Sequence, residues 1–147
     1  MIRRLAIALM VTPLVLTLAD TAAAQTPEPT LDVTVDRFAT FDQAGVVTVT
    51  GTYTCTNVEF PDFISITGSI RQAVGRFSIV GTFGFIDNAT CDGTTQTWSA
   101  VAVPENGTFR GGKATVIASG GVCDLELLIC AVDFGEPQTV QLRGGST

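Results

Sequence analysis

One stretch of the chain, residues 46–55, restricts the possible folds more than any other. From Val47 to Cys55 an apolar residue or glycine alternates with a threonine. Successive side chains of a β-strand point to opposite faces of the sheet, so this alternation predicts a half-buried strand whose threonines face solvent. Because Cys55 continues the apolar row, we expect its sulfur to point into the core and to meet a partner from another segment.

The same period of two recurs along the chain. Alternating segments occupy residues 31–36, 64–70, 77–85, 96–103, 113–119 and 138–143, and residues 122–132 form the most apolar run after position 24. Turn-forming residues separate these segments, and the pairs Gly111–Gly112 and Gly120–Gly121 are expected to break strands. No window has the apolar stripe and caps of a helix. Seven or eight short strands predict an all-β, antiparallel sandwich.

The first 24 residues have the pattern of a signal peptide. Arg3 and Arg4 precede a fourteen-residue apolar run, residues 5–18, and three alanines end the segment at Ala24. A bilayer span needs about 20 apolar residues, so we expect export and no stable membrane anchor after cleavage before Gln25. The predicted organisation is a signal peptide (1–24), a flexible leader (25–30), one β-sandwich domain (31–143) and a disordered tail (144–147).

Charge and composition exclude several functions. Without residues 1–24, which hold two of the eight basic and one of the 14 acidic residues, the net charge is −7. This balance disfavours binding to nucleic acid, which needs clustered Lys and Arg. The sequence contains no histidine, which excludes Ser-His-Asp and Cys-His catalysis and histidine metal sites. We expect no catalytic residues, no metal and no cofactor.

Four cysteines, Cys55, Cys91, Cys123 and Cys130, predict two disulfides in an exported chain, with three possible pairings. Their separations do not fit a zinc site. Seven extended residues span about 23 Å, whereas a disulfide needs Cα atoms within about 7 Å, so a bridge from Cys123 to Cys130 requires the chain to turn back between them. The leucines in that interval are more typical of a strand. A bridge from Cys55 to Cys91 would close a long loop and contribute about 4 kcal/mol.

Few side chains suggest a site. Asp32 with Asp36 and Asp124 with Glu126 each lie on one strand face, and we interpret both pairs as solvated surface residues. Trp98 shares a face of a predicted strand with the small residues Ala100 and Ala102 and is expected in the core. Asn88 and Asn106 begin glycosylation acceptor patterns, which we interpret as turns.

The segment 57–63 is the candidate binding loop, and Phe60, Pro61, Asp62 and Phe63 are its candidate contact residues. Loops at the end of a sandwich often carry recognition, and Pro61 lowers the entropy that the loop loses on ordering. The alternative, which the usual burial of large apolar side chains favours, is that Phe60 caps the core while Phe63 begins the next strand.

Several short motifs are shared with a known group of proteins. They are Gly51-Thr-Tyr-Thr-Cys55, Cys91-Asp-Gly, Gln96-x-Trp98 and Phe109-x-x-Gly112-Lys-Ala, followed by two closely spaced cysteines. This pattern resembles small secreted bacterial proteins of unknown function. The resemblance implies an immunoglobulin-like β-sandwich in which Cys55 pairs with Cys91 and Cys123 with Cys130, and it implies no site residues. In size, export and disulfide number the chain is also similar to neocarzinostatin-type apoproteins, which hold a small aromatic ligand.

These observations predict a secreted, non-enzymatic interaction or structural module with an unknown protein partner. A carrier with an apolar cleft between its sheets for a small apolar ligand is one alternative, because nine phenylalanines and many glycines could leave such a cleft. A secreted protease inhibitor is another, since small disulfide-braced domains can present a rigid loop to an enzyme.

Overall fold

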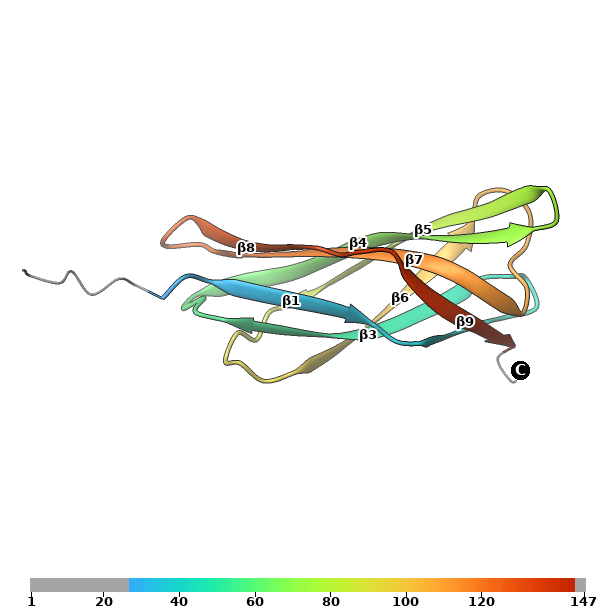
Figure 1. Ribbon diagram of the computed structural model, residues 1–147. Helices are drawn as coiled ribbons and strands as arrows, with labels where there is room; N and C mark the ends of the chain where they lie inside the picture. The colour runs from blue at the N-terminus through green and yellow to red at the C-terminus, as the bar shows by residue number, and fades with distance from the viewer. Residues whose placement is uncertain (1–26, 145–147) are drawn as a thin grey trace, which may run out of the picture.

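A computed structural model describes residues 27–144 (Figure 1). The predicted signal peptide and the last three residues of the predicted tail therefore lie outside the described residues. The described part contains nine strands and no helix. The strands are β1 (Thr30–Val35), β2 (Phe38–Phe41), β3 (Val47–Thr56), β4 (Pro61–Val74), β5 (Phe77–Asn88), β6 (Gln96–Pro104), β7 (Gly112–Asp124), β8 (Ile129–Phe134) and β9 (Gln138–Gly144).

Seven of the strands form a closed ring of hydrogen-bonded neighbours, in the order β3-β2-β9-β7-β4-β5-β6 and back to β3. β1 adds to this ring beside β3, and β8 adds beside β7. β2 and β9 run parallel, whereas the other pairs are antiparallel. The predicted all-β class is confirmed. The expected purely antiparallel sandwich is replaced by a closed seven-stranded barrel with mixed strand directions.

The ring closes through β2, a short strand that the sequence pattern did not predict. Both β1 and β2 pair with β3, but β2 also pairs with β9. The backbone N–H of Asp36 donates to the carbonyl of Thr50 on β3, at 2.8 Å. The carbonyl of the next residue, Arg37, accepts from Gln141 on β9, at 2.9 Å. Two consecutive residues thus join opposite sides of the molecule.

The barrel is flattened and elongated (Figure 1). One broad side consists of β1, β3 and β6, and the other of β4, β5, β7 and β8. The β7–β8 turn and the start of β1 lie at one end, and the β4–β5 turn and the end of β9 lie at the other. Where β1 approaches β8, the backbone N–H of Val33 donates to Oδ2 of Asp133, at 2.7 Å.

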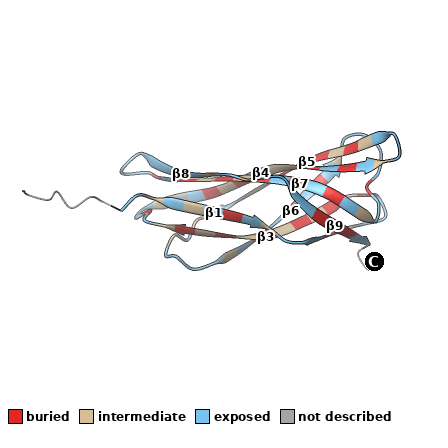
Figure 2. Cartoon of the chain, viewed as in Figure 1, coloured by how far each residue is buried: buried red, intermediate tan, exposed pale blue. Residues whose placement is uncertain are grey.

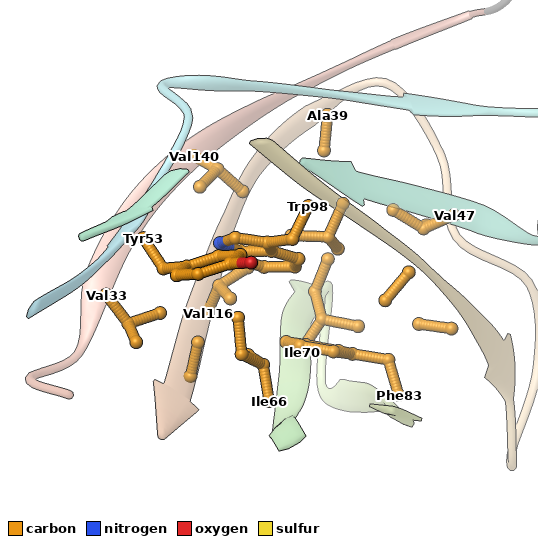
Figure 3. Close-up of a cluster of buried hydrophobic side chains, with 14 of the residues drawn as sticks. Val33, Ala39, Val47, Tyr53, Ile66, Ile70, Phe83, Trp98, Val116 and Val140 are labelled. Carbon is orange, nitrogen blue, oxygen red and sulfur yellow. The ribbon is translucent and has the colours of Figure 1, made fainter. Parts of the chain in front are cut away.

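The core lies between the two broad sides, and β3 contributes to it as predicted (Figure 2). Its apolar row from Val47 to Cys55 is buried, and its threonines are partly exposed. Trp98 is 2% exposed, which confirms the prediction that it belongs to the core. Its ring stacks on that of Phe83, with 5.9 Å between the centroids. Figure 3 shows side chains from several strands converging on Trp98.

Gly51 makes room for the indole ring. A Cβ at this position would lie 2.0 Å from the carbonyl oxygen of Thr34 and 2.7 Å from Nε1 of Trp98. Because glycine has no Cβ, Nε1 of Trp98 reaches across β3 and donates to the carbonyl of Thr34, at 3.1 Å. The glycine in β3 therefore permits a hydrogen bond between β6 and β1.

Two sequence-based expectations about β7 and β8 are wrong. Gly120 and Gly121 do not end a strand, because β7 continues to Asp124. A Cβ on Gly120 would lie 2.6 Å from Cγ2 of Val33, so this glycine allows β1 to approach β7 closely. Residues 125–128, expected to be strand, form a turn instead.

The disulfide pairing follows the predicted pattern. Cys55 pairs with Cys91, with 4.6 Å between their Cα atoms, and Cys123 pairs with Cys130, at 4.0 Å. Cys55 is buried, as its place in the apolar row predicts. Cys123 and Cys130 are exposed and face each other across β7 and β8, which is possible because the chain turns back between them. Two disulfides are typical of a protein that folds in an oxidising compartment.

Candidate functional site

The β7–β8 turn is held by one buried carboxylate, that of Asp124. Its Oδ1 accepts hydrogen bonds from the backbone N–H groups of Glu126 and Leu127, both at 2.9 Å. Its Oδ2 accepts from the backbone N–H groups of Glu59 and Phe60, both at 3.0 Å. The carboxylate therefore joins the β7–β8 turn to the loop that follows β3.

These hydrogen bonds also determine the charge state of Asp124. The backbone N–H groups of Leu127 and Phe60 are the main reason that the pKa of Asp124 lies below its ordinary value, although burial acts in the opposite direction. The side chain is ionised at neutral pH. The expectation that Asp124 and Glu126 form a solvated acidic pair is thus wrong for Asp124, which is fully buried.

Exposed apolar side chains surround this carboxylate. Leu128 is 83% exposed and has a positive φ of 53°, at the tip of the turn. Phe60 is 48% exposed, and the carbonyl of Phe60 accepts a hydrogen bond from the N–H of Leu125, at 3.3 Å. We call the exposed set the apolar end: Phe60, Phe63, Leu125, Leu127, Leu128 and Ile129.

A small hollow of about 240 Å³ adjoins the apolar end. Pro27, Val58, Cys91, Leu127 and Ile129 are among the residues that line it. The first described residues are held here because Nδ2 of Asn57 donates to the carbonyl of Glu28, at 2.9 Å. The start of the described chain, both disulfide-bonded segments and the β7–β8 turn therefore meet at one end of the molecule.

The candidate binding loop is shorter than the sequence predicts. Phe60 lies in the loop, but Pro61, Asp62 and Phe63 belong to β4, with a register shift between Pro61 and Ile64. The side chain of Asp62 lies outside the described ones. Phe60 and Phe63 are both nearly half exposed. The expectation that Phe60 caps the core is wrong, because Val58 is the loop side chain that enters the core, whereas the backbone of Phe60 is bonded to Asp124 and its ring stays half exposed.

Sequence reasoning missed the leucines of the β7–β8 turn as functional candidates. A signal for them was present. An aspartate directly after Cys123, with the partner cysteine seven positions on, is typical of a turn in which the carboxylate accepts the following backbone N–H groups. Leucines inside such a turn are exposed, because nothing folds over them.

Other candidate groups have structural roles. Asn106 accepts from the backbone N–H of Val80 and donates to the carbonyl of Ser78, both at 2.9 Å, as the turn interpretation predicts. Between residues 27 and 144, no three or more Asp, Glu or Cys side chains are grouped as metal ligands would be. Within the same range no helix is long and apolar enough to cross a membrane.

Comparison with known proteins adds a family to this geometry. Residues 29–131, from the first strand into β8, match a family of unknown function (DUF6299). The chain belongs to this family. The match includes the candidate loop, the β7–β8 turn and all four cysteines of the DUF6299 domain. No curated protein matches the chain.

Proposed function

We propose that this DUF6299 protein is a secreted, non-enzymatic binding module that holds a protein partner against its apolar end. The supporting observation is the Asp124 carboxylate, which fixes two separate exposed apolar segments beside each other. Exposed apolar side chains that are held rigidly lose little entropy on binding and are typical of interaction sites. Side chains that only capped the core would be buried, and the loops that carry them would not need a carboxylate to hold them together at the surface.

Secretion is part of the proposal. It is supported by the signal-like residues 1–24 and by the two disulfides. The absence of histidine from the sequence supports a non-enzymatic role, and Asp124, the buried acid at this end, uses its carboxylate to bind backbone N–H groups.

The immunoglobulin-like architecture also belongs to the proposal. In that fold the first, second, fourth and fifth strands form one sheet, and the third, sixth and seventh strands form the other. If β1 and β2 count as one split first strand, β3 and β6 would be the second and fifth strands. β4 and β7 would be the third and sixth, which is consistent with the pairing of β4 with β7. A DUF6299 domain would then carry its binding end where such folds carry loops.

Two alternatives have weaker support. A carrier for a small apolar ligand would need an open cleft between the sheets, but Trp98, Phe109 and Ile66 fill the space there. The hollow at the apolar end, about 240 Å³, is smaller than the roughly 300–1,000 Å³ of most ligand pockets. A larger hollow of about 410 Å³ lies at the β4–β5 turn and the loop 106–110, and not in a cleft between the sheets. A protease inhibitor would present an extended loop, whereas Leu128 has a left-handed backbone, with φ 53°.

The test removes the apolar side chains and leaves the fold in place. The mature protein and the variant Leu127→Ser/Leu128→Ser are immobilised and exposed to envelope and culture-medium proteins of the source cell. We expect at least one protein to be retained about tenfold better by the wild type, because solvent-exposed apolar anchors dominate such contacts. Phe134→Ser is the matched control, since Phe134 is 82% exposed and lies away from the apolar end, at the far end of β8. Equal retention by the wild type and the double variant would contradict the proposal.

A further inference from the structure

The basic residues of the molecule are unevenly distributed along its length. The part between residues 27 and 144 contains six basic residues: Arg37, Arg71, Arg76, Arg110, Lys113 and Arg143. None of them belongs to the apolar end or lines its hollow. The acidic residues Glu28, Glu59 and Glu126 are exposed there instead.

The basic residues gather towards the opposite end. Arg76 lies in the β4–β5 turn, and Arg110 lies in the loop before β7. Lys113 opposes Gln141 where β7 begins and β9 ends, and the guanidinium of Arg143 lies 3.5 Å from the centre of the Phe38 ring. We call residues 74–77, 106–113 and 143 the basic end. Figure 1 places the β4–β5 turn and the end of β9 far from the β7–β8 turn.

The basic end is hollowed. A cavity of about 410 Å³ is lined by Val74, Phe77, Ile79 and Arg110, together with residues 106–108. Its rim is fixed by the two hydrogen bonds of Asn106, which hold the loop 105–107 against β5. Phe77 is 78% exposed at this hollow. The exposed carboxylate of Glu105 lies in the same loop, but the cations Arg76, Arg110, Lys113 and Arg143 outnumber it. The basic end therefore combines apolar walls with a net positive charge.

The two ends complement each other in shape and in charge. At the apolar end Leu127 and Leu128 project from a disulfide-braced turn, beside the carboxylate of Glu126. At the basic end an apolar hollow lies beside Arg110. Opposite charges around an apolar contact favour one partner and one orientation. The exposed carboxylates of two apolar ends repel each other, so contact between two apolar ends is disfavoured.

We propose that copies of this chain associate head to tail, with the apolar end of one copy docked in the hollow at the basic end of the next. This inference rests on the proposed function and names a second copy as the partner. Because the two contacting surfaces lie at opposite ends of an elongated molecule, each added copy leaves one free end of each kind. Such a contact does not close on itself and produces linear chains.

The test uses two variants, each of which disables one end. Leu127→Ser/Leu128→Ser removes the projecting leucines, and Arg76→Glu/Arg110→Glu reverses the charge at the hollow. All four side chains are exposed, so both variants should fold; the near-ultraviolet circular dichroism of buried Trp98 and the mass of the doubly oxidised chain check this. Sedimentation velocity is measured between about 10 µM and 1 mM, the range suited to a contact smaller than a standard interface.

We expect the weight-average sedimentation coefficient of the wild type and of Phe134→Ser to rise with concentration, and each end variant alone to remain monomeric. An equimolar mixture of the two variants should form dimers and nothing larger, because only one intact contact is available to each pair. A wild type that stays monomeric, or a charge-reversed variant that still associates, would overturn the head-to-tail contact. Neither result affects the proposed function, which is contradicted only when the leucine variant retains the same partner as the wild type.

Discussion

Two buried centres organise this molecule in different ways. Around Trp98, apolar side chains fill the space between the broad sides, and the one polar atom of the indole ring donates to Thr34. Around Asp124, one carboxylate accepts four backbone N–H groups from two loops. The first centre depends on packing and is insensitive to pH, whereas the second depends on a charge. The stability of the fold and the arrangement of the apolar end are therefore separable.

Removing the indole should have the largest effect. Trp98→Ala is expected to lower the free energy of unfolding by about 4 kcal/mol, because it leaves a cavity in a closed core. Urea denaturation followed by circular dichroism measures this loss. Val101→Ala, on the exposed face of the same strand, should cost under about 0.5 kcal/mol. Similar losses for the two variants would mean that Trp98 is not the packing centre.

Filling the space at Gly51 should have the next largest effect. Gly51→Ala forces a methyl group against the carbonyl of Thr34 and the indole of Trp98, and should cost about 3 kcal/mol. Gly121→Ala is the matched control, since a Cβ at Gly121 meets nothing within 4 Å. We expect this control to stay within about 1 kcal/mol of the wild type. Chemical denaturation monitored by Trp98 fluorescence distinguishes the two glycines.

Neutralising the second centre should have a smaller effect that depends on pH. Asp124→Asn replaces an acceptor of four hydrogen bonds by an amide, and should lower Tm by about 5–10 °C at pH 7. The amides of segments 57–60 and 125–128 should exchange hydrogen faster, while the amides around Trp98 keep their protection. Uniform loss of protection throughout the barrel would show that the two centres are not separable.

The pH dependence follows from the direction of the pKa shift. The pKa of Asp124 is lower in the folded protein than the value of about 3.9 in the unfolded chain, so between these values the unfolded state binds more protons. The stabilisation is complete above the unfolded value and is lost as pH falls through the folded one. Thermal unfolding between pH 7 and pH 2 should show a steeper loss for the wild type than for Asp124→Asn. Parallel curves would exclude Asp124 as the cause.

The smallest effect is expected at the apolar end itself. Phe60→Ser should lower the free energy of unfolding by less than about 1 kcal/mol, because the ring is already half exposed. Phe83→Ser, which removes a buried ring, should cost about 3 kcal/mol or more. A large loss at Phe60 in urea denaturation would return this side chain to the core.

The sequence predicted the parts of the fold that one strand face determines. The alternation in residues 47–55 and the burial of Trp98 follow from side-chain period alone. β2 was not predicted because its pairing depends on β9, about 100 positions further along the chain, and a four-residue strand has no distinct period. Gly120–Gly121 was misinterpreted because a glycine that lets β1 approach has the same appearance in sequence as a glycine that breaks a strand.

Only one of the two segments of the candidate site, the loop with Phe60, could be predicted from the sequence. Phe60 could be found because it interrupts the alternation and precedes a proline. The leucines after Asp124 could not be assigned to a turn from their own preferences, which favour regular structure. The four N–H groups that bind the carboxylate come from two segments about 65 residues apart in the chain, and only the fold brings them together.

The hydrogen bond between Asp133 and Val33 has a consequence for how these molecules can aggregate. A strand edge with free N–H groups invites a strand from another molecule and is a starting point for amyloid-like growth. In this protein the outward N–H of Val33 is occupied by a side-chain carboxylate of the same chain. An incoming strand would have to displace that acid and leave its charge beside the new pair. The middle of the β1 edge, at Val33, is thereby protected against strand addition.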